Sequence, residues 1–474
     1  MPAPPELRRV LGLWDIVTIN IVAVVGLRWI ARSARVGAPS ITLWLLAWLL
    51  FFLPLAAAIV ELSSRHPEQG GIYAWARRAF GPVHGFVCGW CLWVNNLFYF
   101  PSLLLFAAAN TLLAFGDRFT GFLDDRFYST AFVLSGIWLC AGLNVLGFGA
   151  SRWLQRLGFI STWIPAMLLI LFGAVAFATF GSATSFAAGA LVPSEDFWTT
   201  VSLWSAMCFA FSGFEIAAFM GEEVKDARRT IPRAALVAGG LVTFIYIAGS
   251  TSVLVALPAD SLVERSGIAD AVDLASGRVG LAGLGALTGG LLAIGALAGT
   301  NSWFGGAARV PFAAGVDRAL PAAFARLHPR YHTPHVAIAV QGVLASAIFL
   351  ASVFVSVAGG ATTVQEAYDI MVNLTILTYF VPYLYLFPAL VRLRTASGSP
   401  GSEPGVIRVP GGRVGLLTVA GAGFCATAVA LALIFIPPEG TENVLNYEAN
   451  VIGQAALILG AGVVLYWLYG ARPR

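Results

Sequence analysis

The sequence predicts an all-α integral membrane protein with about 12 transmembrane helices. Hydrophobic residues make up 58% of the 474-residue chain and charged residues only 11%, and the mean hydropathy is +0.81. Apolar runs of about 20 residues, the length needed to cross a bilayer as a helix, recur along the whole chain. Glycine and charged residues interrupt two of these runs near the middle of the membrane, which predicts broken helices that line a polar cavity.

The predicted spans follow one another closely, and basic residues gather in every second connection. In chain order the spans are residues 11–37, 40–63, 83–115, 129–150, 155–180, 197–221, 231–257, 280–309, 334–357, 367–393, 414–436 and 450–470. Most of the 28 Lys and Arg residues fall in the connections on the side of the N-terminus. Cytoplasmic loops are enriched in Lys and Arg, so we expect a cell-membrane protein with both termini in the cytoplasm. The net charge of +4 reflects this bias and indicates no nucleic-acid partner.

The first span is interrupted after Gly26, where three arginines follow in an apolar run. An arginine at the middle of a bilayer costs about 2.5–3.5 kcal/mol, so these side chains need water, protein or a ligand around them. A helix that breaks at Gly26 and resumes near Arg28 has free N–H groups for a carboxylate and free carbonyls for an amine. The candidate substrate-binding residues of this break are Val25, Gly26, Leu27, Arg28 and Trp29.

The three arginines of this span, Arg28, Arg32 and Arg35, are spaced four and three residues apart and share one face of a helix. They form either an anion-attracting stripe or structural pairs with Glu215, Asp369 or loop carbonyls. Both interpretations stay open for Arg28, and the structural one is favoured for Arg35.

The sixth span contains a second break, and five consecutive residues there are candidates for substrate binding: Phe211, Ser212, Gly213, Phe214 and Glu215. Carbonyls freed at Phe211 and Ser212 suit a protonated amine. Glu215 is either a proton carrier or a fixed counter-ion, and the fixed role is favoured. Phe214 and Trp303 are candidates for aromatic gates, although packing is the more common role of an aromatic residue in an apolar core.

The third span adds Asn95 and Tyr99 to the candidate substrate-binding residues. Amides in apolar surroundings need hydrogen-bond partners, so Asn95 and Asn96 are expected to face the interior of the bundle. They either join helices to one another or line the cavity, and the sequence does not separate these roles.

The spacing of the two breaks predicts an inverted repeat of two five-span halves within one membrane domain, residues 1–474. The first half is residues 11–180 and the second is residues 197–393; two extra C-terminal helices follow in residues 414–470.

Metal, cofactor and enzyme chemistry are not indicated. Cys88 and Cys91 form a Cys-x-x-Cys pattern inside an apolar span without a second pair of ligands, so we interpret them as packing residues. The five histidines lie in loops or at the ends of spans, and no nucleophile is paired with a base. We therefore expect no metal, no cofactor and no enzyme activity.

Three connecting loops resemble those of the amino acid–polyamine–organocation (APC) transporter superfamily, and the resemblance covers essentially the whole chain. The motifs are Pro67–Pro82 after the second span, Glu222–Ala234 after the sixth, and Arg309–Pro321 with His328–Pro334 after the eighth. Val409–Gly412 and Ile436–Pro438 resemble glutamate/γ-aminobutyrate antiporters, whereas Asn95–Pro101 resembles plant-type polyamine and amino-acid carriers. The chain departs from the family in two places. Gly26-Leu27-Arg28 keeps only the first glycine of a Gly-Ser-Gly-like break, and Thr162 stands where some members place a lysine.

The resemblance implies a secondary active amino-acid transporter, a permease or antiporter that works by alternating access. The expected partners are a small-molecule substrate, membrane lipid and a coupling proton or sodium ion. Because Arg28 repels cations, we expect neutral or acidic amino acids to be preferred. The alternatives are a polyamine or cationic amino-acid transporter and a transporter-like nutrient sensor. A channel is disfavoured because the polar residues concentrate at two breaks and form no continuous stripe.

Overall fold

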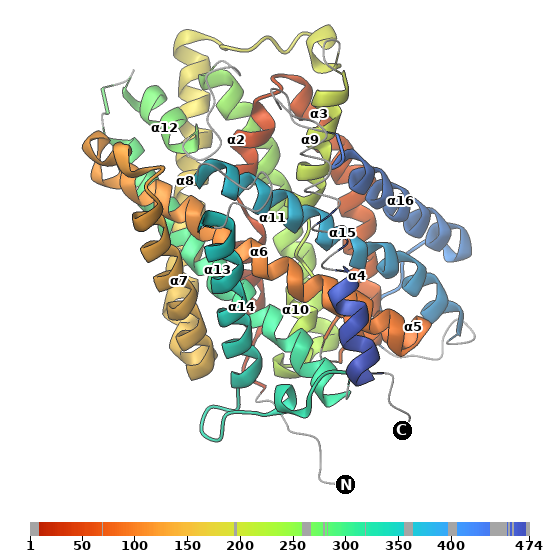
Figure 1. Cartoon of the computed structure of the whole chain (residues 1–474). Helices are drawn as coiled ribbons and strands as arrows, with labels where there is room; N and C mark the ends of the chain where they lie inside the picture. Colours follow the sequence, from red (N-terminus) through yellow and green to blue (C-terminus); the bar gives the residue numbers. More distant parts are fainter. Residues whose placement is uncertain are drawn as a thin grey trace.

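The computed structural model is helical through nearly all of the chain that it describes (Figure 1). The described residues are 9–68, 70–193, 197–257, 267–277, 280–281, 283–317, 319–354, 364–396, 405–436, 453, 456 and 459–470. The α-helices are α1 (Leu13–Val24), α2 (Arg28–Ala34), α3 (Pro39–Ala47), α4 (Leu53–Arg65), α5 (Ile72–Phe80), α6 (Pro82–Phe115), α7 (Arg126–Leu146), α8 (Phe148–Phe180), α9 (Phe197–Ala210), α10 (Ile216–Phe219), α11 (Ala227–Ala256), α12 (Gly267–Gly277), α13 (Leu284–Val316), α14 (His335–Phe354), α15 (Val364–Ala396) and α16 (Gly412–Leu433). Short helical turns are η1 (Trp48–Phe52), η2 (Asp117–Phe122), η3 (Ala188–Leu191), η4 (Gly221–Glu223), η6 (Ala322–Ala325) and η7 (Tyr466–Gly470).

The predicted all-α membrane fold is confirmed. In the described chain nine helices are long and apolar enough to cross a membrane, or ten when α1 and α2 count as one bent span. This number is lower than the predicted number of about 12 spans for two reasons. A break divides residues 197–221 into short helices, and residues 450–470 lie partly outside the described residues. The predicted boundary between residues 129–150 and 155–180 is displaced, because the chain turns at Gly147, which has a φ of +94°.

Both predicted interruptions are present in the structure. After α1 the backbone is extended at Val25, and α2 resumes at an angle of 40° to α1. After α9 the chain leaves the helix, and it resumes with α10 at Ile216. Gly213 lies between these helices with a φ of +108°, a conformation that favours glycine.

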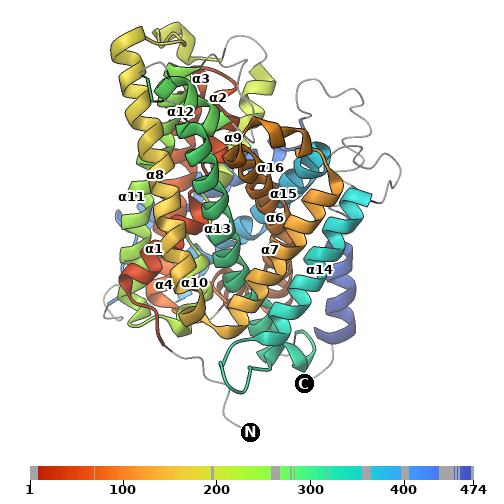
Figure 2. The ribbon, with the colours of Figure 1, turned by 90° about the vertical axis from the view of Figure 1, so that its left-hand side faces the viewer.

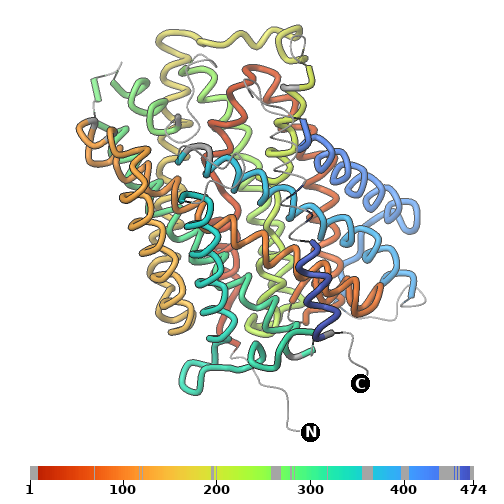
Figure 3. The backbone as a smooth tube through the Cα atoms, in the orientation of Figure 1, coloured from red at the N-terminus to blue at the C-terminus, as the bar shows by residue number. Residues whose placement is uncertain are grey.

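The broken helices lie inside the bundle. Helices α6 and α15 cross it obliquely, side by side, and they are the most buried of the long helices (Figure 3). In helices α7, α8, α14 and α16 fewer than half of the residues of the apolar stretch are buried, as in helices that face lipid. Figure 2 shows α13 between the outer helices α8 and α14.

The start of α1 and the end of η7 lie at the same face of the bundle, which we call the terminal face (Figures 1 and 2). The short helix η2, which lies in the connection between α6 and α7, is toward the opposite face (Figure 1). This arrangement is consistent with an even number of spans.

Ion pairs hold the loops of the terminal face against the ends of the spans. Arg309 of α13 forms two hydrogen bonds with Glu223, at 2.8 and 3.1 Å. Asp317 pairs with Arg77 at 3.0 Å and accepts a hydrogen bond from Tyr73 at 2.8 Å. Four further motif residues lie outside the described residues: Gln69, Arg318, Pro437 and Pro438.

Candidate functional site

The first break is held by side chains from two other helices. The Tyr246 hydroxyl of α11 accepts a hydrogen bond from the Gly26 amide at 3.1 Å and lies 2.8 Å from the Val24 carbonyl oxygen. It also lies 3.0 Å from the carbonyl oxygen of Ala210, at the end of α9, so it joins the two breaks. Trp303 of α13 donates to the Ala23 carbonyl at 2.8 Å.

Backbone hydrogen bonding resumes after the break with Trp29 and Ile30, whose amides donate to the carbonyls of Gly26 and Leu27. Within the described chain, the amides of Leu27 and Arg28 therefore have no backbone acceptor. These two N–H groups can bind an anionic group of a ligand.

The second break is held by tyrosines of α15. The Gly213 amide donates to the Tyr383 hydroxyl at 3.2 Å. The hydroxyls of Tyr383 and Tyr379 both donate to Oε1 of Glu215, and Oε2 of this fully buried carboxylate has no hydrogen-bond partner among the described residues. Glu215 is therefore tied to the tyrosines, and it forms no pair with Arg28.

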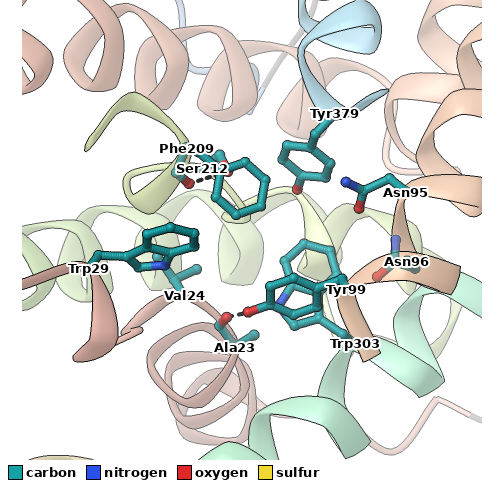
Figure 4. A pocket seen from close by; sticks show the side chains of 10 residues that line it. All are labelled: Ala23, Val24, Trp29, Asn95, Asn96, Tyr99, Phe209, Ser212, Trp303 and Tyr379. Atoms are coloured by element: carbon teal, nitrogen blue, oxygen red, sulfur yellow. Dashed lines mark hydrogen bonds between the residues drawn. The ribbon is translucent and has the colours of Figure 1, made fainter. Parts of the chain in front are cut away.

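A small cavity lies between the two breaks, and we call it the central cavity (Figure 4). Its lining residues are Ala23, Val24, Trp29, Asn95, Asn96, Tyr99, Phe209, Ser212, Trp303 and Tyr379. Its volume is about 10 Å³, enough for about one water molecule, so a substrate of amino-acid size requires the surrounding helices to move apart.

Aromatic rings from five elements enclose the central cavity. The Phe209 ring lies 5.4 Å from the Trp29 ring and 5.3 Å from the Tyr379 ring, measured between centroids. The Trp303 ring lies 5.9 Å from Tyr99 and 6.0 Å from Tyr379. These rings exclude water, while the Trp303 indole N–H and the Tyr379 hydroxyl are already bonded to Ala23 and Glu215.

Arg28 borders a second cavity next to the first. This second cavity is lined by Val22, Ala23, Val25, Gly26, Leu27, Arg28, Tyr99, Leu103, Phe106, Ser161, Thr162, Leu292, Gly295, Ala296 and Gly299. The Arg28 side chain is buried, and it forms no ion pair with any residue that the structure describes. Its Nη1 donates to the Tyr368 hydroxyl at 3.4 Å, and its Nε has no hydrogen-bond partner there.

The predicted site residues fall into three groups. Trp29, Asn95, Tyr99, Ser212 and Trp303 line the central cavity. Val25, Gly26, Leu27 and Arg28 line the second cavity, which Tyr99 also reaches.

The third group, Phe211, Gly213, Phe214 and Glu215, lines neither cavity. The rings of Phe211 and Phe214 pack against Phe52 at 5.1 and 5.2 Å, which is the packing role weighed for such residues. Arg32 is half-buried and Arg35 is exposed, so burial along the arginine stripe decreases away from the break.

The sequence interpretation missed the tyrosines Tyr246, Tyr368, Tyr379 and Tyr383. A signal was available, because a hydroxyl in an apolar span must find a partner inside the protein.

No group of three or more His, Cys, Asp or Glu side chains that could hold a metal ion occurs in the described part of the chain. Cys88 and Cys91 are buried free thiols of α6. At the terminal face, burial and the nearby Asp317 carboxylate raise the pKa of Tyr73 above its usual range, so its hydroxyl remains a hydrogen-bond donor.

Comparison with known proteins agrees with this architecture. An uncharacterised transporter of Legionella pneumophila is 29% identical over 469 residues, which are 98% of this chain and 97% of that protein. A probable agmatine/putrescine antiporter of Lactococcus lactis is 23% identical over 440 residues, 91% of this chain and 88% of that protein. The crystal structure of MhsT in complex with L-phenylalanine has the same fold, with a TM-score of 0.62 at 16% identity, covering 90% of this chain and 100% of that one.

The family model described as "Amino acid permease" matches residues 11–462, almost the full length of the chain. The predicted resemblance to APC-type transporters is therefore confirmed. The chain is a membrane transporter that belongs to the amino acid permease family.

Proposed function

We propose that the chain carries neutral or acidic amino acids across the cell membrane by alternating access. The observation that carries the proposal is Arg28, a buried guanidinium beside the broken helix without an ion-pair partner in the described chain. A buried charge is stable only when other groups compensate it, so this site favours a ligand that brings an acceptor or a negative charge.

The charge of Arg28 discriminates strongly between substrates. At an effective dielectric constant of about 20, two like charges about 6 Å apart repel each other by roughly 3 kcal/mol. This energy corresponds to about a hundredfold in affinity. A substrate with a net positive charge is disfavoured by that factor, and one with a second carboxylate gains from the same interaction.

The two breaks supply complementary groups for an amino acid. The amides of Leu27 and Arg28 suit the α-carboxylate, and the carbonyls at Val25 and Ser212 suit the protonated amine. Arg28 is then free to contact an acceptor of the substrate side chain. In this proposal Glu215 serves as a fixed acceptor that positions Tyr379 at the cavity wall.

Alternating access requires contacts that open in turn. On one side of the cavity, Trp303 and Tyr379 close on Ala23 and Phe209. Beyond them, the Arg309–Glu223 pair joins α13 to the loop that follows α10 at the terminal face. We infer that this face is cytoplasmic, because the basic connections predict cytoplasmic termini.

We also propose that residues 11–180 and residues 197–393 are two inverted repeats, followed by an extension at residues 414–470. Antiport, proton coupling and sodium coupling are separated by measuring uptake under an imposed pH gradient, an imposed sodium gradient or preloaded amino acid.

The alternative substrate is an amine, because one relative is a probable agmatine/putrescine antiporter. Its identity to this chain is only 23%, and Arg28 opposes a cation in this cavity. The sensor alternative predicts binding without uptake.

The test is uptake into proteoliposomes with a panel of labelled acidic, neutral and basic amino acids and of amines. We expect uptake of acidic or neutral amino acids. The Arg28→Ala variant should weaken an acidic substrate far more than a neutral one. The exposed Arg35 provides the matched control, and Arg35→Ala should leave the selectivity unchanged. Tight uptake of arginine or putrescine by the unmodified protein, unaffected by Arg28→Ala, would overturn the proposal.

A further inference from the structure

The Arg28 guanidinium sits among three aromatic rings that come from three different helices. Its Cζ lies 4.6 Å from the ring centroid of Trp29, 5.3 Å from that of Tyr99 and 5.9 Å from that of Tyr368. These rings belong to α2, α6 and α15. All three distances fall within the range of cation–π attraction, which is strongest for a cation removed from water.

The surroundings of Arg28 are those of a binding site for a cation. Within the described chain no carboxylate forms an ion pair with it, and its hydrogen bond to the Tyr368 hydroxyl is long at 3.4 Å. The aromatic faces therefore supply most of the compensation for the buried charge.

The rings are held in place by neighbours other than Arg28. Trp29 packs edge-on against Phe209 at 5.4 Å, and Tyr99 packs against Trp303 at 5.9 Å. Tyr368 is fully buried on α15. The three faces are thus expected to keep their positions when the arginine side chain is removed.

Removal of the side chain would also connect the cage with open space. Arg28 lines the second cavity, and Ala23 and Tyr99 line both the second and the central cavity. Truncation at Cβ would free the volume of a guanidinium and its methylene stem beside both of them. A small planar cation could then enter from the transport site.

We propose that Arg28 is a tethered ligand that fills a guanidinium-binding cage made by Trp29, Tyr99 and Tyr368, and that its removal creates a site for free guanidinium compounds. The side chain then excludes cationic substrates by occupying their place as well as by its charge. This inference rests on the proposed function in that the cage adjoins the proposed substrate site, but its test measures binding and not uptake.

The experiment uses the purified full-length protein in detergent and records its unfolding temperature against increasing methylguanidinium chloride. Methylammonium chloride, which lacks the planar guanidinium, controls for ionic strength. Arg28→Ala should show a saturable rise of about 2 °C near ten times the dissociation constant with methylguanidinium alone. The unmodified protein and Arg35→Ala should show none. Arg28→Ala combined with Tyr368→Leu, which removes one face of the cage, should lose the rise.

Equal responses of unmodified protein and Arg28→Ala, or no response of Arg28→Ala, would overturn the proposal. If Arg28→Ala cannot be purified as a monodisperse protein, the yield of this variant after solubilisation is measured with and without methylguanidinium instead. A higher yield with methylguanidinium than with methylammonium supports the cage, and equal yields refute it. Amino-acid uptake by the unmodified protein reports separately on the proposed function, so the two ideas can fail independently.

Discussion

The Tyr246 hydroxyl is the contact that joins the two broken helices, and its removal tests whether their geometry controls transport. It accepts from the Gly26 amide at 3.1 Å and lies 2.8 and 3.0 Å from the carbonyl oxygens of Val24 and Ala210. One O–H is shared between the two carbonyls, so Tyr246→Phe removes about two hydrogen bonds. The ring itself stays, stacked on Trp44 with a centroid distance of 4.7 Å.

The expected loss can be bounded from these contacts. Hydrogen bonds inside membrane proteins contribute about 0.6 kcal/mol on average, and a buried polar group left without a partner costs about 1–3 kcal/mol. Tyr246→Phe should therefore weaken the substrate-binding geometry by about 1–3 kcal/mol in total. We expect initial uptake into proteoliposomes to fall at least about fivefold, while the unfolding temperature decreases by only a few degrees.

Tyr128→Phe is the matched control, because its hydroxyl makes a single hydrogen bond to the Ala108 carbonyl, at 2.9 Å, away from the breaks. It should retain more than half of the uptake. If Tyr246→Phe transports as well as Tyr128→Phe, the hydroxyl does not set the geometry of the site and the reasoning is wrong.

Three further predictions concern the breaks, the topology and the terminal face. Gly26→Leu and Gly213→Leu should abolish uptake without loss of expression, because an added Cβ would lie 2.6 and 2.8 Å, respectively, from a tryptophan ring. Gly142→Leu is the control, because Gly142 has open space around it. Normal uptake by the Gly26 or the Gly213 variant would remove that break from the site. A cysteine introduced by Thr120→Cys should react with an impermeant maleimide on intact cells, and labelling only after permeabilisation would contradict the topology. Arg309→Ala should destabilise the protein by about 3–5 kcal/mol, because it leaves the buried carboxylate of Glu223 unpaired. Neutralising Glu223 in the same protein should restore part of that loss. An unchanged unfolding temperature of Arg309→Ala would show that the pair is not stabilising.

The sequence was sufficient for the fold because a bilayer allows few alternatives. Apolar length identifies a span, and glycine with a charge inside such a run identifies a break, since lipid leaves no other place for these residues. Gly26 and Gly213 were found in this way. The turn at Gly147 was not, because an apolar run that continues through a turn does not mark where the chain reverses.

The site was predictable only in part, because hydropathy reports that a residue is buried and not which residues surround it. Trp303 and Phe214 were indistinguishable as aromatic residues of apolar spans, yet Trp303 lines the central cavity and Phe214 packs against Phe52. The tyrosines of α15 that bind Glu215 and Arg28 lie more than 150 residues away from them in the chain. Periodicity carries no information about contacts over that distance.

The contacts that hold the breaks differ in what a transport cycle demands of them. Tyr246 joins the ends of α1 and α9 to each other, so its hydrogen bonds can persist while these helices move as one unit. The bond from Trp303 to Ala23 and the Arg309–Glu223 pair join α13 to these helices, and in the proposed alternating-access cycle they open for the cavity to reach the terminal face. Opening is feasible for the ion pair in that cycle, because helices that part at this face admit water to both charges, whereas in the closed structure both are buried. A pair of the same strength at Arg28, deep in the bundle, would lack that replacement. This difference explains why the aromatic faces, whose attraction to a cation survives small displacements, are better suited than a carboxylate to hold the guanidinium there.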